Sequence, residues 1–207
     1  ELMYLLKIIL VVLLSFIFIS PLKSEEVYDC LSLTEKYGRE FKLPNKLLTS
    51  ISFVESGLKK NKKFISWPWT LNVDGKSKYF DTKLEALEYL RQNNSKTKNI
   101  DVGCMQISTK FHAKQFDDLN QILDPVSNVK YAAKLLRELY KVHKTWNEAI
   151  SRYHSSVPKR KKIYLNKVYS FWNKLRQKKI STTQLSEIET NKKIEYFRKE
   201  LRKQSYM

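Results

Sequence analysis

Glycine and proline are scarce in this sequence, with four Gly and five Pro among 207 residues. This scarcity excludes a collagen-like chain and argues against a disordered, low-complexity chain. Two cysteines are too few for a small scaffold that depends on several disulfides. Because 42% of the residues are hydrophobic and 13% are aromatic, the chain can bury a substantial core. The length favours one domain of ordinary size with an appended segment.

Several motifs of cofactor chemistry are also missing. The sequence contains no glycine-rich phosphate loop and no dinucleotide-binding fingerprint. His112, His143 and His154 lie far apart and have no Cys or carboxylate partner at the spacing of metal ligands. No Ser-His-Asp order stands out either. We therefore predict no metal site and no cofactor.

Acidic residues are outnumbered, since 39 Lys and Arg face 21 Asp and Glu and give a net charge of +18. Residues 157–179 carry nine Lys or Arg and no acid, whereas residues 25–156 carry 22 basic and 16 acidic residues. Such an excess favours an anionic partner, which could be nucleic acid, a membrane surface or an acidic polymer. Charge alone does not choose among them, and a Lys-rich composition also arises from the base composition of coding DNA.

The sequence has one long hydrophobic run, Leu5 to Ser20. Its 16 residues, interrupted by Lys7, are fewer than the roughly 20 that a membrane-spanning helix needs. Pro21 and a polar, acidic stretch follow, which is the outline of a signal peptide. We expect residues 1–24 to be a signal peptide that directs export, and we expect no stable membrane span after its cleavage. An uncleaved membrane anchor is the alternative.

Export determines how the two cysteines are interpreted. Cys30 and Cys104 would meet an oxidising compartment and could form a disulfide with each other. Alternatively, Cys104 is a small buried apolar residue and Cys30 is a free thiol near the processing site. The sequence leaves both possibilities open.

Helix signals dominate the region after the signal peptide. Residues typical of helix starts are found at Ser32, Pro44, Thr82, Asp124 and Thr145. Apolar residues follow these positions at the three- and four-residue spacing of an amphipathic helix. A further helix is indicated by the apolar face formed by Tyr164, Val168, Phe171 and Leu175, with basic residues on the outside.

Residues 69–80 differ, because β-formers flank an Asp74-Gly75 turn and predict a β-hairpin. We interpret the fold as mainly α with this one small hairpin as an insertion. Residues 179–207 are polar and helix-prone with few core-sized side chains. We therefore expect the folded domain at residues 25–178 and a polar helical C-terminal tail at 179–207. That tail is either a frayed surface helix or a docking segment.

Glu55 lies where a carboxylate is unfavourable, in the last turn of a helix that we expect to end at Gly57. It shares a face with the apolar Leu48 and Ile51. Burial and the negative helix end both disfavour the charged form, so the pKa of Glu55 should rise and the group should keep a proton near neutral pH. These properties suit a general acid. The alternative is that Glu55 reaches past the helix end into water.

Four segments together resemble a known family. They are SFVESG at 52–57, DVGCMQI at 101–107, DPVSNVKYAA at 124–133 and AISRYHS at 149–155. In order and spacing they resemble the SLT-type lytic transglycosylase domain, over about residues 30 to 175. The stretch WPWTLN at 67–72 resembles the subgroup associated with secretion systems and other envelope-spanning machines. The resemblance implies a goose-type-lysozyme-like helical domain that acts on peptidoglycan.

The resemblance also implies site residues. Glu55 matches the catalytic acid of the family, and Ser56 the residue that supports the same turn. The residues implied in substrate binding are Ser56, Gly103, Met105, Gln106, Ser108, Tyr153 and His154. Ser108 and His154 depart from the pattern, because the family often has Asn or Met at the first position and Asn at the second. The contact normally made there to the sugar acetamide is therefore open.

Ordinary glycoside hydrolysis uses two carboxylates, and Asp101 is the best candidate for a second one. The resemblance implies a reaction with one acid, in which the 2-acetamido group stabilises the anomeric centre and the C6 hydroxyl of N-acetylmuramic acid closes on C1. It thus implies cleavage of the β-1,4 bond between N-acetylmuramic acid and N-acetylglucosamine, with a 1,6-anhydro product and Glu55 as the single general acid and base.

The partners expected on this interpretation are peptidoglycan and an envelope-spanning secretion machine, with the protein itself a monomer and nucleic acid not bound. Two alternatives remain. The first is a lysozyme-like peptidoglycan hydrolase that uses Asp101 or a positioned water. The second is a non-enzymatic module whose basic residues 159–179 bind nucleic acid or anionic lipid.

Overall fold

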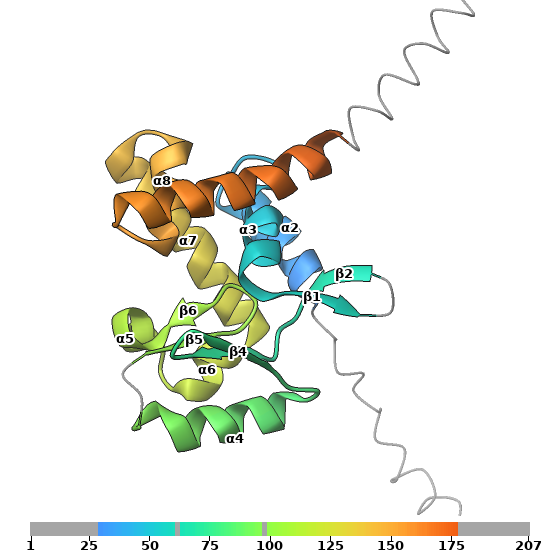
Figure 1. Ribbon diagram of the computed structural model, residues 1–207, viewed down its shortest axis with the longest axis vertical. Helices are drawn as coiled ribbons and strands as arrows, with labels where there is room; N and C mark the ends of the chain where they lie inside the picture. The colour runs from blue at the N-terminus through green and yellow to red at the C-terminus, as the bar shows by residue number, and fades with distance from the viewer. Residues whose placement is uncertain (1–28, 61–62, 97–98, 178–207) are drawn as a thin grey trace, which may run out of the picture.

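The computed structural model describes residues 29–60, 63–96 and 99–177 (Figure 1). Helices make up most of this part of the chain, which confirms the mainly α fold class. They are α2 (Cys30–Glu40), α3 (Leu47–Ser56), α4 (Lys83–Asn94), α5 (Thr109–His112), the 3-10 turn η1 (Ala113–Gln115), α6 (Leu119–Leu123), α7 (Pro125–His143), α8 (Trp146–His154) and a last helix over residues 158–177. The predicted signal peptide, 1–24, and tail, 179–207, lie outside the described residues. No helix within the described ranges is long and apolar enough to span a bilayer.

The strands form two antiparallel sheets. In the first, β1 (Gly57–Lys60) pairs with β2 (Lys63–Ser66). The second has the order β4-β3-β5-β6 and contains β3 (Thr70–Val73), β4 (Lys76–Tyr79), β5 (Ile100–Val102) and β6 (Ile107–Ser108). The predicted hairpin is present as β3 and β4, but it is part of a larger sheet. The added strands β5 and β6 are three and two residues long, too short to give a recognisable alternation of apolar and polar residues.

Local capping explains where most helices begin. Thr82, Asp124 and Thr145 each accept a hydrogen bond from the backbone N–H three residues later, which confirms these three predicted starts. The start predicted at Ser32 is wrong. Asp29 is the N-cap of α2, and the backbone N–H of Ser32 donates to Asp29 Oδ1 at 2.6 Å. The sequence offers two acceptor side chains within four residues, and the helix uses the first.

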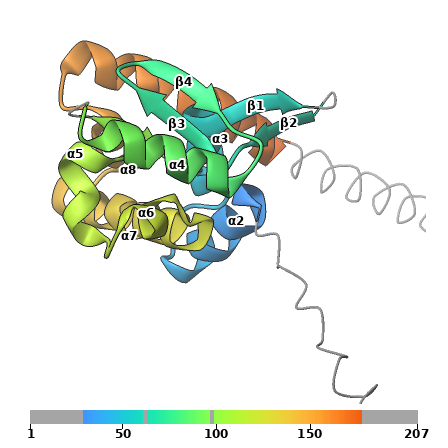
Figure 2. The same ribbon diagram turned by 90° about the horizontal axis from the view of Figure 1, so that it is seen from below.

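Helix α3 carries some of the most deeply buried residues of the core, including Leu47 and Ile51. α2 packs against α3 and α7, and α7 packs against α8. The helix of residues 158–177 crosses over α3 at one end of the molecule, while the four-stranded sheet and α4 occupy the other end (Figure 1). Seen from that end, α4 lies in the middle of the view, with β3 and β4 on one side of it and α6 and α7 on the other (Figure 2).

The helix of residues 158–177 is fixed to the core by aromatic side chains. Trp172 Nε1 donates a 2.8 Å hydrogen bond to the backbone oxygen of Asn45, just before α3. Phe171 stacks on Phe64 of β2 with ring centroids 5.4 Å apart, and it also contacts Phe53 of α3. The helix therefore docks on α3 and on the β1–β2 hairpin together, through its apolar face.

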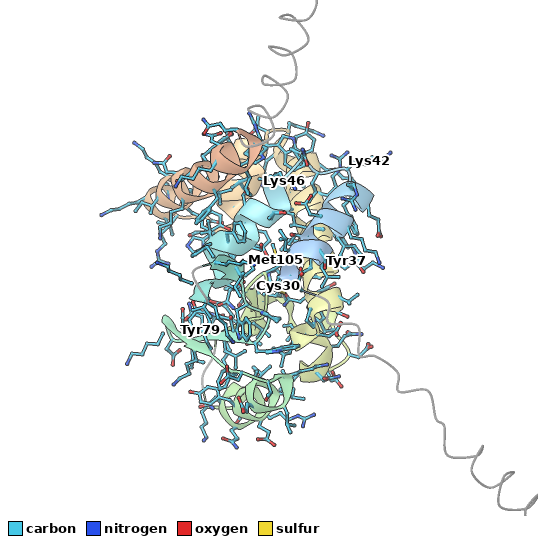
Figure 3. The ribbon with its side chains drawn as sticks, turned by 90° about the vertical axis from the view of Figure 1, so that its right-hand side faces the viewer. Cys30, Tyr37, Lys42, Lys46, Tyr79 and Met105 are labelled. Carbon is cyan, nitrogen blue, oxygen red and sulfur yellow. A yellow bond between two sulfur atoms is a disulfide. The ribbon has the colours of Figure 1, made fainter. Side chains whose placement is uncertain are left out.

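A disulfide joins Cys30, the first residue of α2, to Cys104 in the turn between β5 and β6. Both residues are fully buried, and 74 positions separate them in sequence. Figure 3 shows Cys30 and Met105, the neighbour of Cys104, together in the interior. The disulfide thus links the first described helix to the turn that supports the candidate site.

Candidate active site

A cleft of about 560 Å³ opens between the four-stranded sheet and the helices. Residues from the end of α3, from all four strands of that sheet, from α8 and from the helix of residues 158–177 line it. Glu55 lies in this cleft, as the last residue but one of α3. The carboxyl group of Glu55 thus lies between the four-stranded sheet and the helix of residues 158–177.

Gly57 determines where α3 ends. A Cβ at this position would lie 2.2 Å from the backbone oxygen of Phe53 and 2.4 Å from the ring of Phe64. Only glycine fits such a close approach, so the chain can leave the helix and enter β1 without a break. Glu55 is thereby held in the final helical turn, as the sequence predicted.

Glu55 is partly buried, and Tyr164 Oη donates a 2.5 Å hydrogen bond to its Oε1. Burial raises the pKa of Glu55 from 4.5 to about 7, because the charged form loses hydration. The hydrogen bond from Tyr164 opposes this rise, Asp101 adds to it through charge repulsion, and the positive charge of Lys167 opposes it. At neutral pH Glu55 can therefore both give and take a proton.

Tyr164 is a site residue that the sequence argument missed, because it assigned this residue only to the inward face of a helix. The ring is 3% exposed, and burial and the nearby Glu55 raise the pKa of the phenol well above 10. Tyr164 therefore stays protonated and acts as a hydrogen-bond donor. The available signal was a polar-tipped aromatic on an otherwise apolar helix face.

The hydroxyl of Tyr153 is hydrogen-bonded to the protein backbone and not to Glu55. Its hydroxyl donates to the backbone oxygen of Met105 at 2.8 Å, and its ring lines the cleft. His154 also lines the cleft, and its ring lies parallel to that of Tyr164 with centroids 4.5 Å apart. Partial burial and the charges of Lys167 and Arg160 lower the pKa of His154, which favours the neutral imidazole.

A second carboxyl group, Asp101 of β5, lines the same cleft. Burial raises its pKa, and a 3.3 Å hydrogen bond from Asn99 Nδ2 partly opposes the rise. Ser108 Oγ donates to Asn99 Oδ1 at 2.5 Å, so Asn99 connects Asp101 to Ser108. Asp101 and Ser108 also face each other across β5 and β6.

Three residues expected to bind substrate lie behind the cleft wall instead. The side chains of Ser56 and Met105 are fully buried, Gly103 is also buried, and none of the three lines the cleft. Ser56 Oγ donates to the backbone oxygen of Cys104 at 2.8 Å and so fixes the turn between β5 and β6. Ser56, Gly103 and Met105 are therefore part of the structure behind the cleft and not of its lining.

Asn128 of α7 organises this turn, and the sequence argument did not single it out. The side chain is fully buried, accepts from the backbone N–H of Met105 at 2.9 Å and donates to the backbone oxygen of Val102 at 2.8 Å. Gly103 has φ +78°, and a Cβ there would lie 2.8 Å from Asn128 Nδ2. Gly103 is therefore needed for the close approach of Asn128, not of a ligand.

Gln106 lines the cleft in a backbone conformation with φ +48°. Its Nε2 donates to the backbone oxygens of Thr70 (3.1 Å) and Gly103 (3.0 Å). The amide thus holds β3 against the turn that follows β5. Within residues 29–60, 63–96 and 99–177, no group of three or more His, Cys, Asp or Glu side chains is placed to hold a metal ion.

The raised pKa of Glu55 predicts how stability depends on pH. Below about pH 4.5 the group is protonated in both the folded and unfolded states, and the folded state loses stability as pH rises from there through about 7. A pKa of about 7 instead of 4.5 corresponds to about 3 kcal/mol of unfolding free energy. We expect Glu55→Gln to remove this loss, so that the variant is more stable than wild type at pH 8 and similar at pH 4.

Urea unfolding across that pH range measures the difference. Glu88→Gln, at an exposed position on α4, is the matched control and should follow the wild-type curve at each pH. Parallel curves for Glu55→Gln and wild type would contradict the raised pKa.

Comparison with known proteins identifies the family of this chain. The sequence profile of the transglycosylase SLT domain matches residues 32–173. Neither a curated protein sequence nor a solved structure shows significant similarity to the chain. The matched region runs from α2 to the helix of residues 158–177 and so includes every element that lines the cleft. The chain therefore belongs to the transglycosylase SLT domain family, whose members are peptidoglycan lytic transglycosylases, lyases that act on polysaccharides.

Proposed function

We propose that this protein is an exported lytic transglycosylase that cleaves the β-1,4 bond between N-acetylmuramic acid and N-acetylglucosamine, with Glu55 as the single general acid and base. The observation that carries the proposal is the environment of Glu55. It is a carboxyl group in a cleft with a pKa of about 7, and it accepts a hydrogen bond from Tyr164. General acid–base catalysis is most efficient when the pKa of the group lies near the working pH.

In the first step protonated Glu55 donates its proton to the glycosidic oxygen, and the bond from C1 to that oxygen breaks. The 2-acetamido group of the substrate stabilises the electron-poor C1. The hydroxyl of Tyr164 stabilises the carboxylate that remains, because it donates to Oε1. Glu55 then takes the proton of the C6 hydroxyl while the oxygen of that hydroxyl bonds to C1. No water enters, and the product ends in 1,6-anhydro-N-acetylmuramic acid.

The residues assigned to substrate contact divide into two groups. Gln106, Ser108, Tyr153 and His154 line the cleft and are proposed to face the saccharide. Ser56, Gly103 and Met105 are proposed to position the cleft wall from behind, through the turn that Asn128 holds.

A specific observation favours one second candidate, hydrolysis of the lysozyme type. Asp101 lies in the same cleft, and its charge contributes to the raised pKa of Glu55. A second carboxylate beside the acid could act as nucleophile or activate a water. The two mechanisms differ in their products, since hydrolysis adds one water that the lytic reaction does not.

Mass spectrometry of sacculi digested in ¹⁸O-labelled water separates these mechanisms. We expect unlabelled anhydro products from the wild type, and the same products from Asp101→Asn at a reduced or equal rate. Labelled, hydrated reducing ends would establish the hydrolase instead. An absence of any soluble product from the wild type and from Glu88→Gln would contradict both mechanisms.

The arrangement of the whole chain is part of the same proposal. It consists of a signal peptide at 1–24, the catalytic domain at 25–178 and a polar helical tail at 179–207, in a periplasmic monomer that serves an envelope-spanning machine. The charged surface of the helix of residues 158–177 supports peptidoglycan as its polymeric partner. N-terminal sequencing of the protein isolated from the periplasm and from the membrane distinguishes a cleaved signal from an anchor.

The exposed charges of the helix of residues 158–177 give a separate prediction. Arg160 and Lys167 line the cleft, and Lys161 pairs with Glu148 at 2.6 Å, so these three residues are unsuitable for a test of surface charge. The exposed cations outside the cleft include Lys159, Lys162 and Lys174. Changing these three to Gln should weaken binding to sacculi at low salt and flatten its salt dependence, because exposed charges are screened over about 8 to 10 Å at physiological ionic strength.

Sedimentation with sacculi over a salt series measures this effect, and turnover of a short soluble muropeptide is the control. Turnover should change little, because the proton transfers at Glu55 do not involve the three lysines. Equal losses in binding and turnover would show that they support the fold or the cleft. Salt-sensitive DNA binding by the wild-type protein, without release of muropeptides, would favour the non-enzymatic module.

A further inference from the structure

A row of polar side chains crosses the four-stranded sheet at the cleft. Asn72 of β3 pairs in register with Ser77 of β4 on one side and with Asp101 of β5 on the other, and Asp101 pairs with Ser108 of β6. Residues directly opposite in neighbouring strands share one face of a sheet, and all four line the cleft. At about 4.8 Å per strand spacing, the row extends about 14 Å.

Asn72 is the member of this row with an unfilled hydrogen bond. Its Oδ1 is shielded from solvent, and among the described residues it is the only buried side-chain nitrogen or oxygen atom without a hydrogen-bond partner. Buried polar groups in native proteins nearly always have partners, so such an atom requires an explanation.

The chemistry of the row favours ligands that donate hydrogen bonds. A carboxylate at Asp101 can only accept, and the hydroxyl proton of Ser108 is directed to Asn99. Asn72 adds another acceptor, and its amide can turn about the Cβ–Cγ bond because the preference of this torsion is broad. An amide also offers one donor and one acceptor side by side, which match the C=O and N–H of another amide.

We propose that Asn72 is a specificity-determining residue that binds the 2-acetamido group of an amino sugar, its Oδ1 accepting the acetamido N–H. The inference rests on the proposed function in one respect, that the cleft holds a saccharide. Asn72 is not a catalytic residue in this proposal, and its contribution is to binding and to the choice of sugar. Once the amide turns toward the cleft, a donor of the ligand fills the acceptor that the folded protein leaves without a partner.

Binding of tri-N-acetylchitotriose and of cellotriose tests the proposal by calorimetry. The two sugars share a backbone of β-1,4-linked rings, and a hydroxyl replaces the acetamido group in the second. In the Glu55→Gln background, which prevents turnover, we expect Asn72→Leu to weaken binding of chitotriose about tenfold or more. Cellotriose should bind weakly with Asn72 present, and Asn72→Leu should not weaken it further.

Leu has nearly the shape of Asn, and Asn72 Oδ1 has no partner to lose within the described residues. The melting temperature of Asn72→Leu should therefore equal or exceed that of the parent. Asn72→Ser, which shortens the side chain but keeps it polar, should also lose chitotriose binding and covers the case in which the Leu variant does not fold. Asn166→Leu, at an exposed position outside the cleft, is the matched control.

Three results would overturn the proposal. They are an unchanged affinity for chitotriose in both Asn72 variants, equal losses for chitotriose and cellotriose, and a loss of affinity that accompanies a lowered melting temperature in both variants. The assay requires no turnover. A protein that binds chitotriose through Asn72 but releases nothing from sacculi would contradict the proposed reaction and leave this inference standing.

Discussion

Glu55→Gln is expected to slow the release of soluble muropeptides from sacculi by about 10²- to 10⁴-fold, the usual contribution of a general acid or base. The amide keeps the shape of the carboxyl group and can still accept a hydrogen bond from Tyr164, but it cannot transfer a proton. Chromatography of released fragments under initial-rate conditions measures the effect. The wild-type rate should fall as pH rises above about 7, because protonated Glu55 is then depleted.

Two controls isolate the proton transfer from other effects of the substitution. Glu88→Gln makes the same chemical change on the exposed surface of α4 and should retain the wild-type rate. Circular dichroism and chitotriose binding should be nearly the same for Glu55→Gln and wild type. A purified Glu55→Gln variant that clears a peptidoglycan zymogram as wild type does would refute the assignment of Glu55.

Loss of the disulfide should have the largest effect on stability. Replacing Cys30 and Cys104 with Ala is expected to lower the free energy of unfolding by about 2 to 5 kcal/mol, as removal of a native disulfide from a small secreted domain does. The bridge closes a loop over a sequence separation of 74 and holds the turn after β5 against α2. Activity should fall as well, since Ser56 and Tyr153 both donate to backbone oxygens of this turn.

Urea unfolding with and without a reductant measures this loss. Reductant should shift the wild-type midpoint toward that of the Cys30→Ala, Cys104→Ala double variant, and should leave the variant unchanged. Two free thiols in the unreduced, denatured wild-type protein from its native compartment would contradict the disulfide. A double variant as stable as the oxidised wild type would contradict its structural contribution.

The sequence predicted features that depend on neighbouring residues. Thr82, Asp124 and Thr145 cap their helices through a backbone N–H only three residues away, so a short window contains the whole interaction. The Asp74-Gly75 turn is equally local, and both its residues have positive φ as such a turn requires. The helix start predicted at Ser32 is wrong because Asp29, three residues earlier, offers a competing cap, and the helix uses it.

The parts of the candidate site that the sequence argument missed depend on contacts between distant residues. Asn128 meets the turn after β5 across 23 positions, and Tyr164 meets Glu55 across 109. Asn128 does not differ in type or spacing from an ordinary helix residue, and the polar tip of Tyr164 on an apolar helix face does not identify its partner. Only part of the cleft lining could be predicted. The position of a residue in a motif does not distinguish a side chain in the cleft from one buried behind it.

The hydrogen bond between Tyr164 and Glu55 also affects when the site can exist. Its two residues come from opposite ends of the matched domain, so a nascent chain has long produced Glu55 before Tyr164 is synthesised. Until the helix of residues 158–177 docks, the end of α3 lacks one wall of the cleft and the phenol that faces the carboxyl group. An incomplete or C-terminally trimmed chain therefore has the carboxyl group but not the environment that tunes it. On the proposed function, synthesis through residues 158–177 and docking of this helix therefore come before catalysis at Glu55.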